Sequence, residues 1–344
     1  MSPQYKVLHI ITKLEFGGAQ GNTIWTVTNL NREIFNAKIV SGKGGFLDKE
    51  VNPEKIIFLN HLIRRIAPIR DLLGLIEIFK IIKKEHPVII HTHSSKAGIL
   101  GRIAAKLARV PVIIHTFHGF GFNSEQSAIT RFLFVFLEKI CARISDILIF
   151  VSNSNIDTAN RFGIGNLKQY KLIRSGICLE KYPANPPDAG YRYKKRKELG
   201  IPENAKIVIS TGNLKPQKNP GDFIKIALKI INETENVYFV YAGGGETLDK
   251  VKKQILDLGL SDRCIFTGWR QDVHELLAIS EVFVLTSLWE GLPRSLVEAL
   301  KSGLACVCYK TDGILDLIKE GINGFLVPQK AINEMCEKIK ILLN

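Results

Sequence analysis

Two glutamates on either side of a predicted turn could hold a phosphorylated ligand between them. Residues 282–285 form a short apolar strand, and a turn at Gly291 leads into a helix that we expect to begin at Pro293. Proline suits the first helical position because its φ is preset and its missing N–H has no partner there. The free backbone N–H groups that follow, together with the helix dipole, favour an anion such as a phosphate. Glu290 lies in the loop before this helix, free to reach a ligand.

The second glutamate, Glu298, lies inside the predicted helix. It follows Ser295 and Arg294 by three and four residues, so these three side chains share one helix face. Leu296 and Leu300 point the other way, into the core. A capped amphipathic helix with solvated carboxylates is the simpler alternative, but the preceding strand, turn and proline favour the phosphate site.

Glycines follow several predicted strands at the point where a strand gives way to a helix. A glycine lets the backbone come close to a ligand, and ligands of open α/β sheets bind at the carboxyl ends of strands. The candidates are Gly17, Gly18 and Gly244. The pair Gly17-Gly18 is not part of a G-x-G-x-x-G sequence, so no dinucleotide fingerprint is present, and an ordinary turn remains an alternative.

Imidazole and ammonium groups follow other predicted strands. His118 lies past a strand end, in a loop beside Gly119, which favours ligand contact over a structural role. His93 ends another predicted strand and Lys96 begins the next helix, so both are further candidates, although a solvated Lys96 is equally compatible with the pattern. Lys218 stands near a helix start, where the helix dipole disfavours a cation, and this favours a functional role.

The charge of the chain is strongly positive and unevenly distributed. The net charge is +14 over 344 residues, and residues 1–177 carry 24 Lys/Arg against 12 Asp/Glu. Such a basic half suggests an anionic partner: a phosphorylated substrate, an anionic membrane surface or a nucleic acid. The basic residues are scattered and form no RNP-like or zinc-finger pattern, so we expect no nucleic-acid partner.

The six cysteines include no C-x-x-C pair. Cys306 and Cys308 alternate on an apolar strand and are expected to be small core residues, so neither a disulfide framework nor a metal site is indicated. The chain starts without a signal-peptide pattern, and no apolar run approaches the roughly 20 residues of a membrane span. We therefore expect a cytoplasmic protein that meets a membrane only at its surface.

Predicted strands and helices alternate through both halves of the chain. This alternation predicts two α/β domains, each doubly wound around a mainly parallel sheet, at residues 1–177 and 178–344. The Pro-rich start of residues 182–197 is expected to end the linker between them. A helix predicted at about residues 126–144 contains the apolar run 132–137, which we expect to lie mostly in the core.

The segment at residues 290–298, EGLPRSLVE, resembles the E-x7-E signature of retaining glycosyltransferases of family 4, the glycosyl transferases group 1. The resemblance extends in order over nearly all of the chain. It implies the GT-B fold, in which two Rossmann-like domains face each other across a ligand-binding cleft. It also implies that Glu290 lies at the donor sugar and that Glu298 binds the ribose hydroxyls of the nucleotide.

The resemblance assigns roles to the other candidates as well. It places the loop at Gly17-Gly18 against the donor diphosphate and the acceptor, and His118 against the donor sugar or phosphate, so His118 and Glu290 are the catalytic candidates. The remaining nucleotide-sugar-binding candidates are Gly212, Lys218, Gly244, Gly268, Arg270, Arg294, Ser295 and Leu296, and the acceptor candidates are His93 and Lys96. Family members usually carry an arginine where this chain has Asn213, and they usually continue into a final crossover helix that this chain is expected to lack.

We therefore expect transfer of a sugar from a nucleotide-diphosphate sugar to an acceptor hydroxyl, with retention. The expected acceptor is a polyprenyl-diphosphate-linked glycan of capsule, O-antigen or exopolysaccharide assembly, met at the inner face of the plasma membrane. No cofactor and no metal ion are expected, because the sequence has no Asp-x-Asp and protein cations can offset the leaving charge. A nucleotide-sugar 2-epimerase of the same fold and a non-catalytic nucleotide-sugar-binding protein remain as alternatives.

Overall fold

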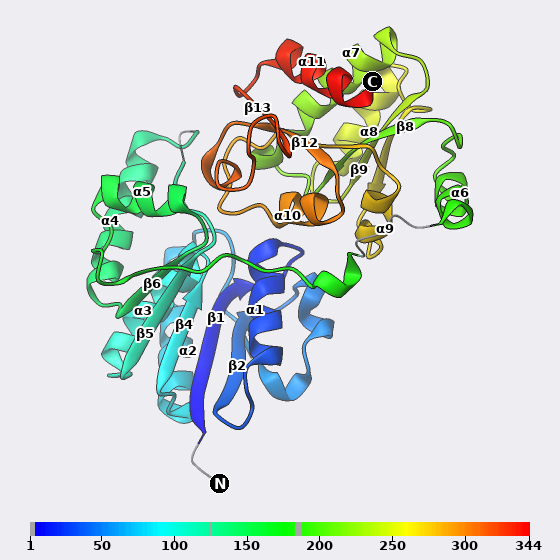
Figure 1. Ribbon diagram of the computed structural model, residues 1–344. Helices are drawn as coiled ribbons and strands as arrows, with labels where there is room; N and C mark the ends of the chain where they lie inside the picture. Colours follow the sequence, from blue (N-terminus) through cyan, green and yellow to red (C-terminus); the bar gives the residue numbers. More distant parts are fainter. Residues whose placement is uncertain (1–3, 124, 183–187) are drawn as a thin grey trace. The chain divides into compact units, whose positions relative to one another are not determined.

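The computed structural model describes residues 4–123, 125–182 and 188–344. The chain divides into two compact units, Met1–Ser175 and Gly176–Asn344, so the division lies two residues before the predicted boundary. The prolines of the predicted linker, at positions 183, 186 and 187, lie outside the described residues. Each unit is built around its own parallel sheet (Figure 1).

In the described part of the first unit, the sheet has the strand order β3-β2-β1-β4-β5-β6-β7. The strands are β1 (Tyr5–Lys13), β2 (Phe35–Gly42), β3 (Ile56–Leu59), β4 (Ile89–His93), β5 (Val112–Phe117), β6 (Ile147–Phe150) and β7 (Tyr170–Leu172). The helices are α1 (Gly18–Asn29), α2 (Pro68–Glu85), α3 (Ser95–Leu107), α4 (Ala128–Arg143) and α5 (Asn153–Phe162). The strand order reverses between β1 and β4, and such a reversal is where open α/β sheets bind ligands.

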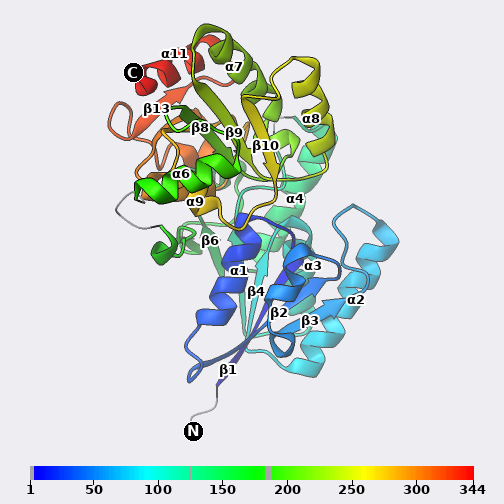
Figure 2. The same ribbon diagram turned by 90° about the vertical axis from the view of Figure 1, so that its right-hand side faces the viewer.

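Side chains of β1 alternate between the two faces of this sheet. Val7 and Ile11 pack in one cluster with Val27 of α1, whereas Leu8 and Ile10 pack in another with residues of α2 and α3. Helix α1 therefore covers one face, and α2 and α3 cover the other (Figure 2). Strands buried on both faces form nearly continuous apolar runs, which made them recognisable in the sequence.

The sheet of the second unit has the order β10-β9-β8-β11-β12-β13 over the residues that the structure describes. Its strands are β8 (Lys206–Thr211), β9 (Val237–Ala242), β10 (Cys264–Gly268), β11 (Val282–Leu285), β12 (Ala305–Tyr309) and β13 (Gly324–Val327). Its helices are α6 (Ala189–Glu198), α7 (Pro220–Glu233), α8 (Leu248–Asp257), α9 (Val273–Ala278), α10 (Arg294–Lys301) and α11 (Ile332–Leu343). The order reverses between β8 and β11, whose carboxyl ends carry the predicted site.

Two core clusters lie on the two faces of this second sheet. One joins Phe223 of α7 and Met335 of α11, and the other joins Leu296 of α10 to the strands. Cys306 and Cys308 are completely buried in the latter cluster, and all six cysteines are free. The prediction of core cysteines without a disulfide framework is confirmed.

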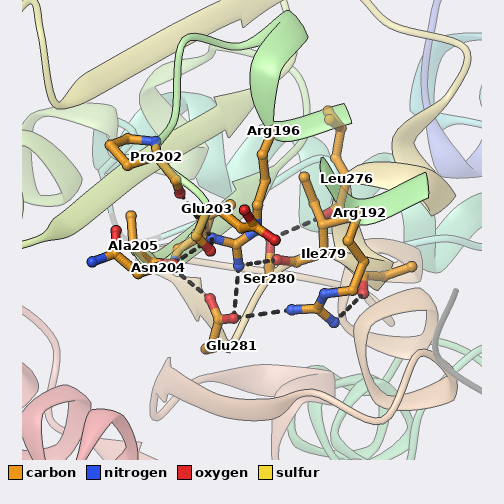
Figure 3. A network of polar contacts seen from close by, with 12 residues as sticks. Arg192, Arg196, Pro202, Glu203, Asn204, Ala205, Leu276, Ile279, Ser280 and Glu281 are labelled. Atoms are coloured by element: carbon orange, nitrogen blue, oxygen red, sulfur yellow. Dashed lines mark hydrogen bonds and ion pairs between the residues drawn. The ribbon is translucent and has the colours of Figure 1, made fainter. Parts of the chain in front are cut away.

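Helix α6 is strongly polar, and one buried arginine ties it to the second sheet (Figure 3). Arg196 is 3% exposed and donates hydrogen bonds to the carbonyl oxygens of Ala205 and Ile279. Its guanidinium also lies 2.9 Å from the carboxylate of Glu281, which Arg192 reaches at 3.3 Å. The planar fork of an arginine can satisfy several acceptors at once, so these cations stabilise the fold rather than offer a free charge.

The predicted burial of the apolar run in α4 is wrong for three of its six residues. Phe132, Leu133 and Phe136 are 71, 50 and 49% exposed. Phe134 and Val135 pack against a core cluster, as predicted. The hydrophobic run correctly predicted a helix, but three of its side chains lie on the solvent-exposed face of that helix.

Candidate active site

A lysine and a glutamate from distant parts of the second unit meet at the carboxyl edge of its sheet. Lys218 Nζ lies 2.5 Å from Glu290 Oε1, and the two side chains are 14 and 8% exposed. Lys218 follows β8 and Glu290 follows β11, which are neighbouring strands. The prediction that Glu290 is free to reach a ligand is therefore wrong for this structure, because Lys218 occupies its carboxylate.

Hydrogen bonds between loops hold this ion pair in place. The Thr286 hydroxyl donates to the carbonyl oxygen of Lys218 at 2.9 Å, and Gln217 Nε2 donates to the carbonyl oxygen of the residue before Glu290 at 2.7 Å. The N–H of Glu290 donates to Asp312 Oδ2 at 2.8 Å. Loops after β8, β11 and β12 thus support one another, so the two charged side chains have a defined position.

The start of α10 carries two buried side-chain atoms that have no hydrogen-bond partner in the described part of the chain. The helix begins at Arg294, with Pro293 just before it, so the predicted start at Pro293 is one residue early. The first N–H groups of any helix have no intrahelical acceptor. Arg294 Nε and Ser295 Oγ are buried without a hydrogen-bond partner among the described residues. Buried polar atoms are nearly always paired, so these atoms point to a polar ligand at this helix start.

Glu298 faces the same side of α10 as Arg294, with 3.6 Å between Arg294 NH2 and Glu298 Oε1, as the spacing predicted. Burial raises the pKa of the Glu298 carboxyl, while the charge of Arg294 and a hydrogen bond from the Tyr182 hydroxyl oppose this rise. Tyr182 is 8% exposed. Nothing in the spacing of the sequence singled it out, since it lies more than a hundred residues before Glu298.

Close packing or backbone conformation explains the three predicted glycine positions in the second unit. A Cβ on Gly244 would lie 2.7 Å from Trp269 Nε1, and Gly212 has a φ of 147°, a positive value that favours glycine. Gly268 has a φ of 74°, a left-handed conformation that favours glycine. The fold therefore needs these glycines, and their contact with a nucleotide remains a prediction.

Two other candidates of the second unit have partners within the protein. Arg270 Nε lies 2.6 Å from Asp272 Oδ1, and Arg270 NH2 lies 2.6 Å from Glu198 Oε1. The side chain of Leu296 is completely buried, and its N–H bonds to the carbonyl oxygen of Pro293 at 3.0 Å. The structure does not bring Arg270 into the Lys218–Glu290 cluster, and it gives Arg270 a structural role in holding α6.

In the first unit, Gly17 has no conformational reason to be glycine. Its φ of 173° is ordinary extended backbone just before α1. The atom nearest to a Cβ there is Oε1 of the movable Gln20 side chain, at 2.5 Å. The predicted close approach of a ligand to Gly17 and Gly18 is compatible with this geometry.

The catalytic candidate His118 lies beside His93, one of the two acceptor candidates. His93 Nδ1 is 3.1 Å from His118 Nε2, and His93 is 1% exposed. The structure therefore places His93 behind His118 and leaves it no surface for an acceptor. Lys96 is 14% exposed and pairs with Asp71 at 2.6 Å, so it joins the starts of α3 and α2 and is not a solvated lysine.

One group in the described chain has side chains close enough to share a metal ion. Ligand atoms of His9, His91 and His93 lie within 4.8 Å of one another. The group contains no carboxylate, and two of its members, His9 and His93, are hydrogen-bonded to each other. The expectation that the chain uses no metal remains a prediction.

Comparison with known proteins identifies the family. Residues 192–344 match glycosyl transferases group 1, and residues 29–181 match glycosyltransferase family 4. The UDP-Gal:alpha-D-GlcNAc-diphosphoundecaprenol alpha-1,3-galactosyltransferase of Escherichia coli is 35% identical over 329 residues, covering 94% of this chain and 84% of its own. The N,N'-diacetylbacillosaminyl-diphospho-undecaprenol alpha-1,3-N-acetylgalactosaminyltransferase of Campylobacter jejuni is 26% identical, covering 77% of this chain and 70% of its own. The structure of HepE from Anabaena, solved with UDP and glucose, has a TM-score of 0.82 at 23% identity and covers 99% of this chain and 90% of its own.

The chain therefore belongs to the family 4 glycosyltransferases, and it has their GT-B fold. Its activity is glycosyl transfer, and the relatives give no support to a 2-epimerase. Within the described residues, every helix is too short or too polar to cross a lipid bilayer.

Proposed function

We propose that this glycosyltransferase moves a hexose or N-acetylhexosamine from a UDP-sugar to a polyprenyl-diphosphate-linked glycan, with retention at the anomeric carbon. The observation that carries the proposal is the buried Lys218–Glu290 pair near the unsatisfied start of α10. The names of the E. coli and C. jejuni relatives support a diphosphoundecaprenol-linked acceptor, and that of the E. coli relative supports UDP as the nucleotide. Retention is what the E-x7-E segment implies.

The leaving group of this reaction is a nucleotide diphosphate that gains negative charge as the glycosidic bond breaks. Lys218, Arg294 and the N–H groups at the start of α10 would neutralise this charge. A phosphate bound by Lys218 competes with Glu290 for the ammonium group, which would release the Glu290 carboxylate towards the donor sugar. Before the donor binds, the ion pair avoids a buried, unpaired charge on either side chain.

Transfer should need no metal ion, because Lys218 and Arg294 would neutralise the diphosphate as a divalent cation does in other transferases. Nucleotide release should therefore be unchanged in excess EDTA. A loss that added Mg²⁺ or Mn²⁺ restores would overturn this expectation.

Glu298 would accept hydrogen bonds from the ribose hydroxyls, and it can do so only as a carboxylate. Because burial raises its pKa, UDP binding should weaken on acidification at a higher pH than an ordinary glutamate would dictate. Tyr182→Phe removes a hydrogen bond that lowers this pKa, so the acid limb should move to still higher pH. Calorimetric titration of UDP from about pH 5 to about pH 8 measures this loss of affinity at acidic pH. Glu298→Gln should bind UDP weakly throughout, and its affinity should not show the same fall on acidification. An identical limb in Tyr182→Phe and wild type would contradict the assignment.

Helix α4 offers a surface for the membrane in which the proposed acceptor lies. Its exposed apolar side chains are spaced i, i+3, i+4, i+7 and i+11 and so form one stripe: they are Ile129, Phe132, Leu133, Phe136 and Ile140. Lys139 and Arg143 are exposed on the same helix. An apolar stripe with basic neighbours is typical of helices that lie in the interface of an anionic membrane. We propose that α4 binds the inner leaflet.

Phe132→Ser/Phe136→Ser should weaken binding to vesicles of equal phosphatidylglycerol and phosphatidylethanolamine at least tenfold, since burying one phenylalanine contributes about 1.5–3 kcal/mol. Co-sedimentation measures the binding. Trp25→Ser, which removes a 60% exposed aromatic residue from α1, is the control and should bind like wild type. Vesicle binding that neither the double variant nor salt reduces would exclude α4 as the contact.

The transferase proposal is tested with a panel of UDP-, GDP- and ADP-sugars, with and without a membrane extract as the source of acceptor. Nucleotide release that depends on the extract and collapses in Glu290→Gln supports it. Epimerised donor without extract would favour the epimerase, and tight nucleotide binding without release would favour the binding protein. The anomeric configuration of the product, read by proton NMR, decides between retention and inversion.

A further inference from the structure

Three histidines of the first unit form a hydrogen-bonded row that ends at His118. His9 lies on β1, His93 ends β4, and His118 directly follows β5, and these strands are neighbours in the sheet. In the parallel register, His9 pairs with His91 and His93 pairs with Thr116. Because side chains alternate along a strand, His9, His93 and His118 lie on the same face of the sheet.

The contacts of this row run from ring to ring. His9 Nδ1 lies 3.0 Å from His93 Nε2, and His93 Nδ1 lies 3.1 Å from His118 Nε2. Burial lowers the pKa of His9 and of His118 to about 4, and burial, with smaller effects of neighbouring rings, lowers that of His93 well below its ordinary value. The three rings are therefore neutral at physiological pH. A neutral imidazole has one N–H and one bare nitrogen, so the two contacts lock the three tautomers together.

Only two arrangements of protons satisfy both contacts. In the first, every ring carries its proton on Nδ1, so His9 donates to His93, His93 donates to His118, and His118 keeps Nδ1–H for a ligand. In the second, every proton is on Nε2, the direction reverses, and His118 presents a bare Nδ1. The two arrangements also differ at the other end of the row, where His9 Nε2 is buried without a partner in the described chain.

The buried end of the row favours the first arrangement. It leaves a bare nitrogen on His9, whereas the second leaves an N–H without an acceptor, and orphaned buried N–H groups are the rarer of the two in proteins. We propose that His9 and His93 are positioning residues that hold His118 as an uncharged Nδ1–H donor to an oxygen of the bound sugar donor. A neutral imidazole can polarise a substrate oxygen without placing a full positive charge beside it. The substrate part of this assignment rests on the proposed function.

The backbone at the end of β4 is fixed by local contacts, which is consistent with a positioning role for His93. Ser94, directly after His93, has a φ of 61° and a ψ of 158°, a conformation rarely adopted outside glycine. Such a backbone conformation is unfavourable and persists only where its surroundings hold it. Here the hydroxyls of Ser94 and Thr12 are 2.7 Å apart, which ties the end of β4 to β1. This hydrogen bond therefore fixes the backbone next to His93 relative to β1, the strand that contains His9.

The tautomers can be read directly by ¹⁵N NMR of the histidine rings, which separates protonated from bare nitrogens. At neutral pH, we expect a protonated Nδ1 and a bare Nε2 on His9, His93 and His118, with signals assigned by single-histidine variants. A protonated Nε2 on His118 would overturn the proposal.

Variants of His9 test whether the row sets the tautomer. His9→Leu removes the first donor, so His118 should become a mixture of both tautomers. His9→Asn carries an amide N–H near the position of Nδ1 and should keep the wild-type pattern. His91→Leu controls for packing, because the His91 ring contacts both His9 and His93 while its Nε2 bonds to Thr116 at 2.7 Å. An unchanged His118 in His9→Leu, or the same mixture in His91→Leu, would contradict the positioning role.

Kinetics give a second readout once the donor is known. His9→Leu should lower kcat about tenfold, which is about the contribution of one hydrogen bond. The Kd for UDP should be unchanged, because the proposed nucleotide-binding side chains, Lys218, Arg294 and Glu298, lie in the second unit. His9→Asn should recover most of kcat. Equal losses in the two variants would mean a packing effect and would overturn the positioning role. The NMR measurement does not require turnover. If the protein released no nucleotide, the proposed function would be wrong, but the NMR spectra would still show which tautomer His118 adopts.

Discussion

Replacing Lys218 with methionine should lower kcat/KM for the nucleotide sugar about 100- to 1,000-fold. A cation aimed at the leaving phosphate acts where charge develops, and the loss of one such group typically has an effect of about this size. The nucleotide-release assay measures it. Lys252→Met, on the exposed side of α8, is the matched control and should change kcat/KM less than about twofold.

The same substitution should also destabilise the second unit by about 3 kcal/mol, because the Glu290 carboxylate, 8% exposed, would be left buried and unpaired. Adding Glu290→Gln removes that charge, so the double variant should recover most of the stability in urea unfolding and none of the activity. If activity returned together with stability, Lys218 would act through folding alone, and its proposed catalytic role would be wrong.

Glu138→Gln should lower the free energy of unfolding of the first unit by about 3–5 kcal/mol, the largest effect on stability that we expect. Arg102 NH2 lies 2.5 Å from Glu138 Oε2, with side chains 0 and 3% exposed, and Arg102 Nε also donates to the carbonyl oxygen of Gly98 at 2.8 Å. Removing one partner of such a pair leaves a buried, unpaired charge. Urea unfolding followed by circular dichroism measures the loss.

The double variant Arg102→Met/Glu138→Leu should be more stable than Glu138→Gln, because apolar side chains of similar size can replace a buried ion pair at little cost. Lys13→Met, which breaks the more exposed pair of Lys13 with Glu15 at 3.7 Å, should change stability by no more than about 1 kcal/mol. If the double variant were as unstable as Glu138→Gln, the loss of stability would come from side-chain packing at this position and not from an unpaired charge.

The parts of the site that were predictable from the sequence depend on local geometry. The pairing of Arg294 with Glu298 follows from the period of a helix, and the strand and turn before α10 follow from the pattern of apolar residues and from Gly291. Such features involve residues within one or two turns of each other. The E-x7-E segment is likewise continuous, which is why it identified the family.

Contacts that depend on strand order were not predictable in the same way. Lys218 and Glu290 are 72 positions apart, and His9 and His93 are 84 apart. They meet because β8 lies beside β11 and β1 lies beside β4, although neither pair is consecutive in the chain. Each of these residues was visible as a polar group near a strand end, but its partner was not.

The apolar run of α4 illustrates the same limit for burial. Its composition predicted a helix, but whether a helix face meets a core depends on what packs against it, and that is a property of the tertiary structure. The structure buries Glu138, Cys141 and Ala142 and exposes Phe132 and Phe136. A hydrophobic face was therefore mistaken for core.

The sequence by itself determined the alternating α/β architecture, the helix start that suits a phosphate, and membership of the family 4 glycosyltransferases, because these depend on short periods and on one continuous segment. Only the tertiary structure decided that Glu290 is paired with Lys218, that Tyr182 meets Glu298, and that His93 stands behind His118. Those contacts join residues that are far apart in the sequence, because parallel strands are connected by long crossovers and neighbouring strands need not be consecutive. No local sequence pattern predicts such contacts.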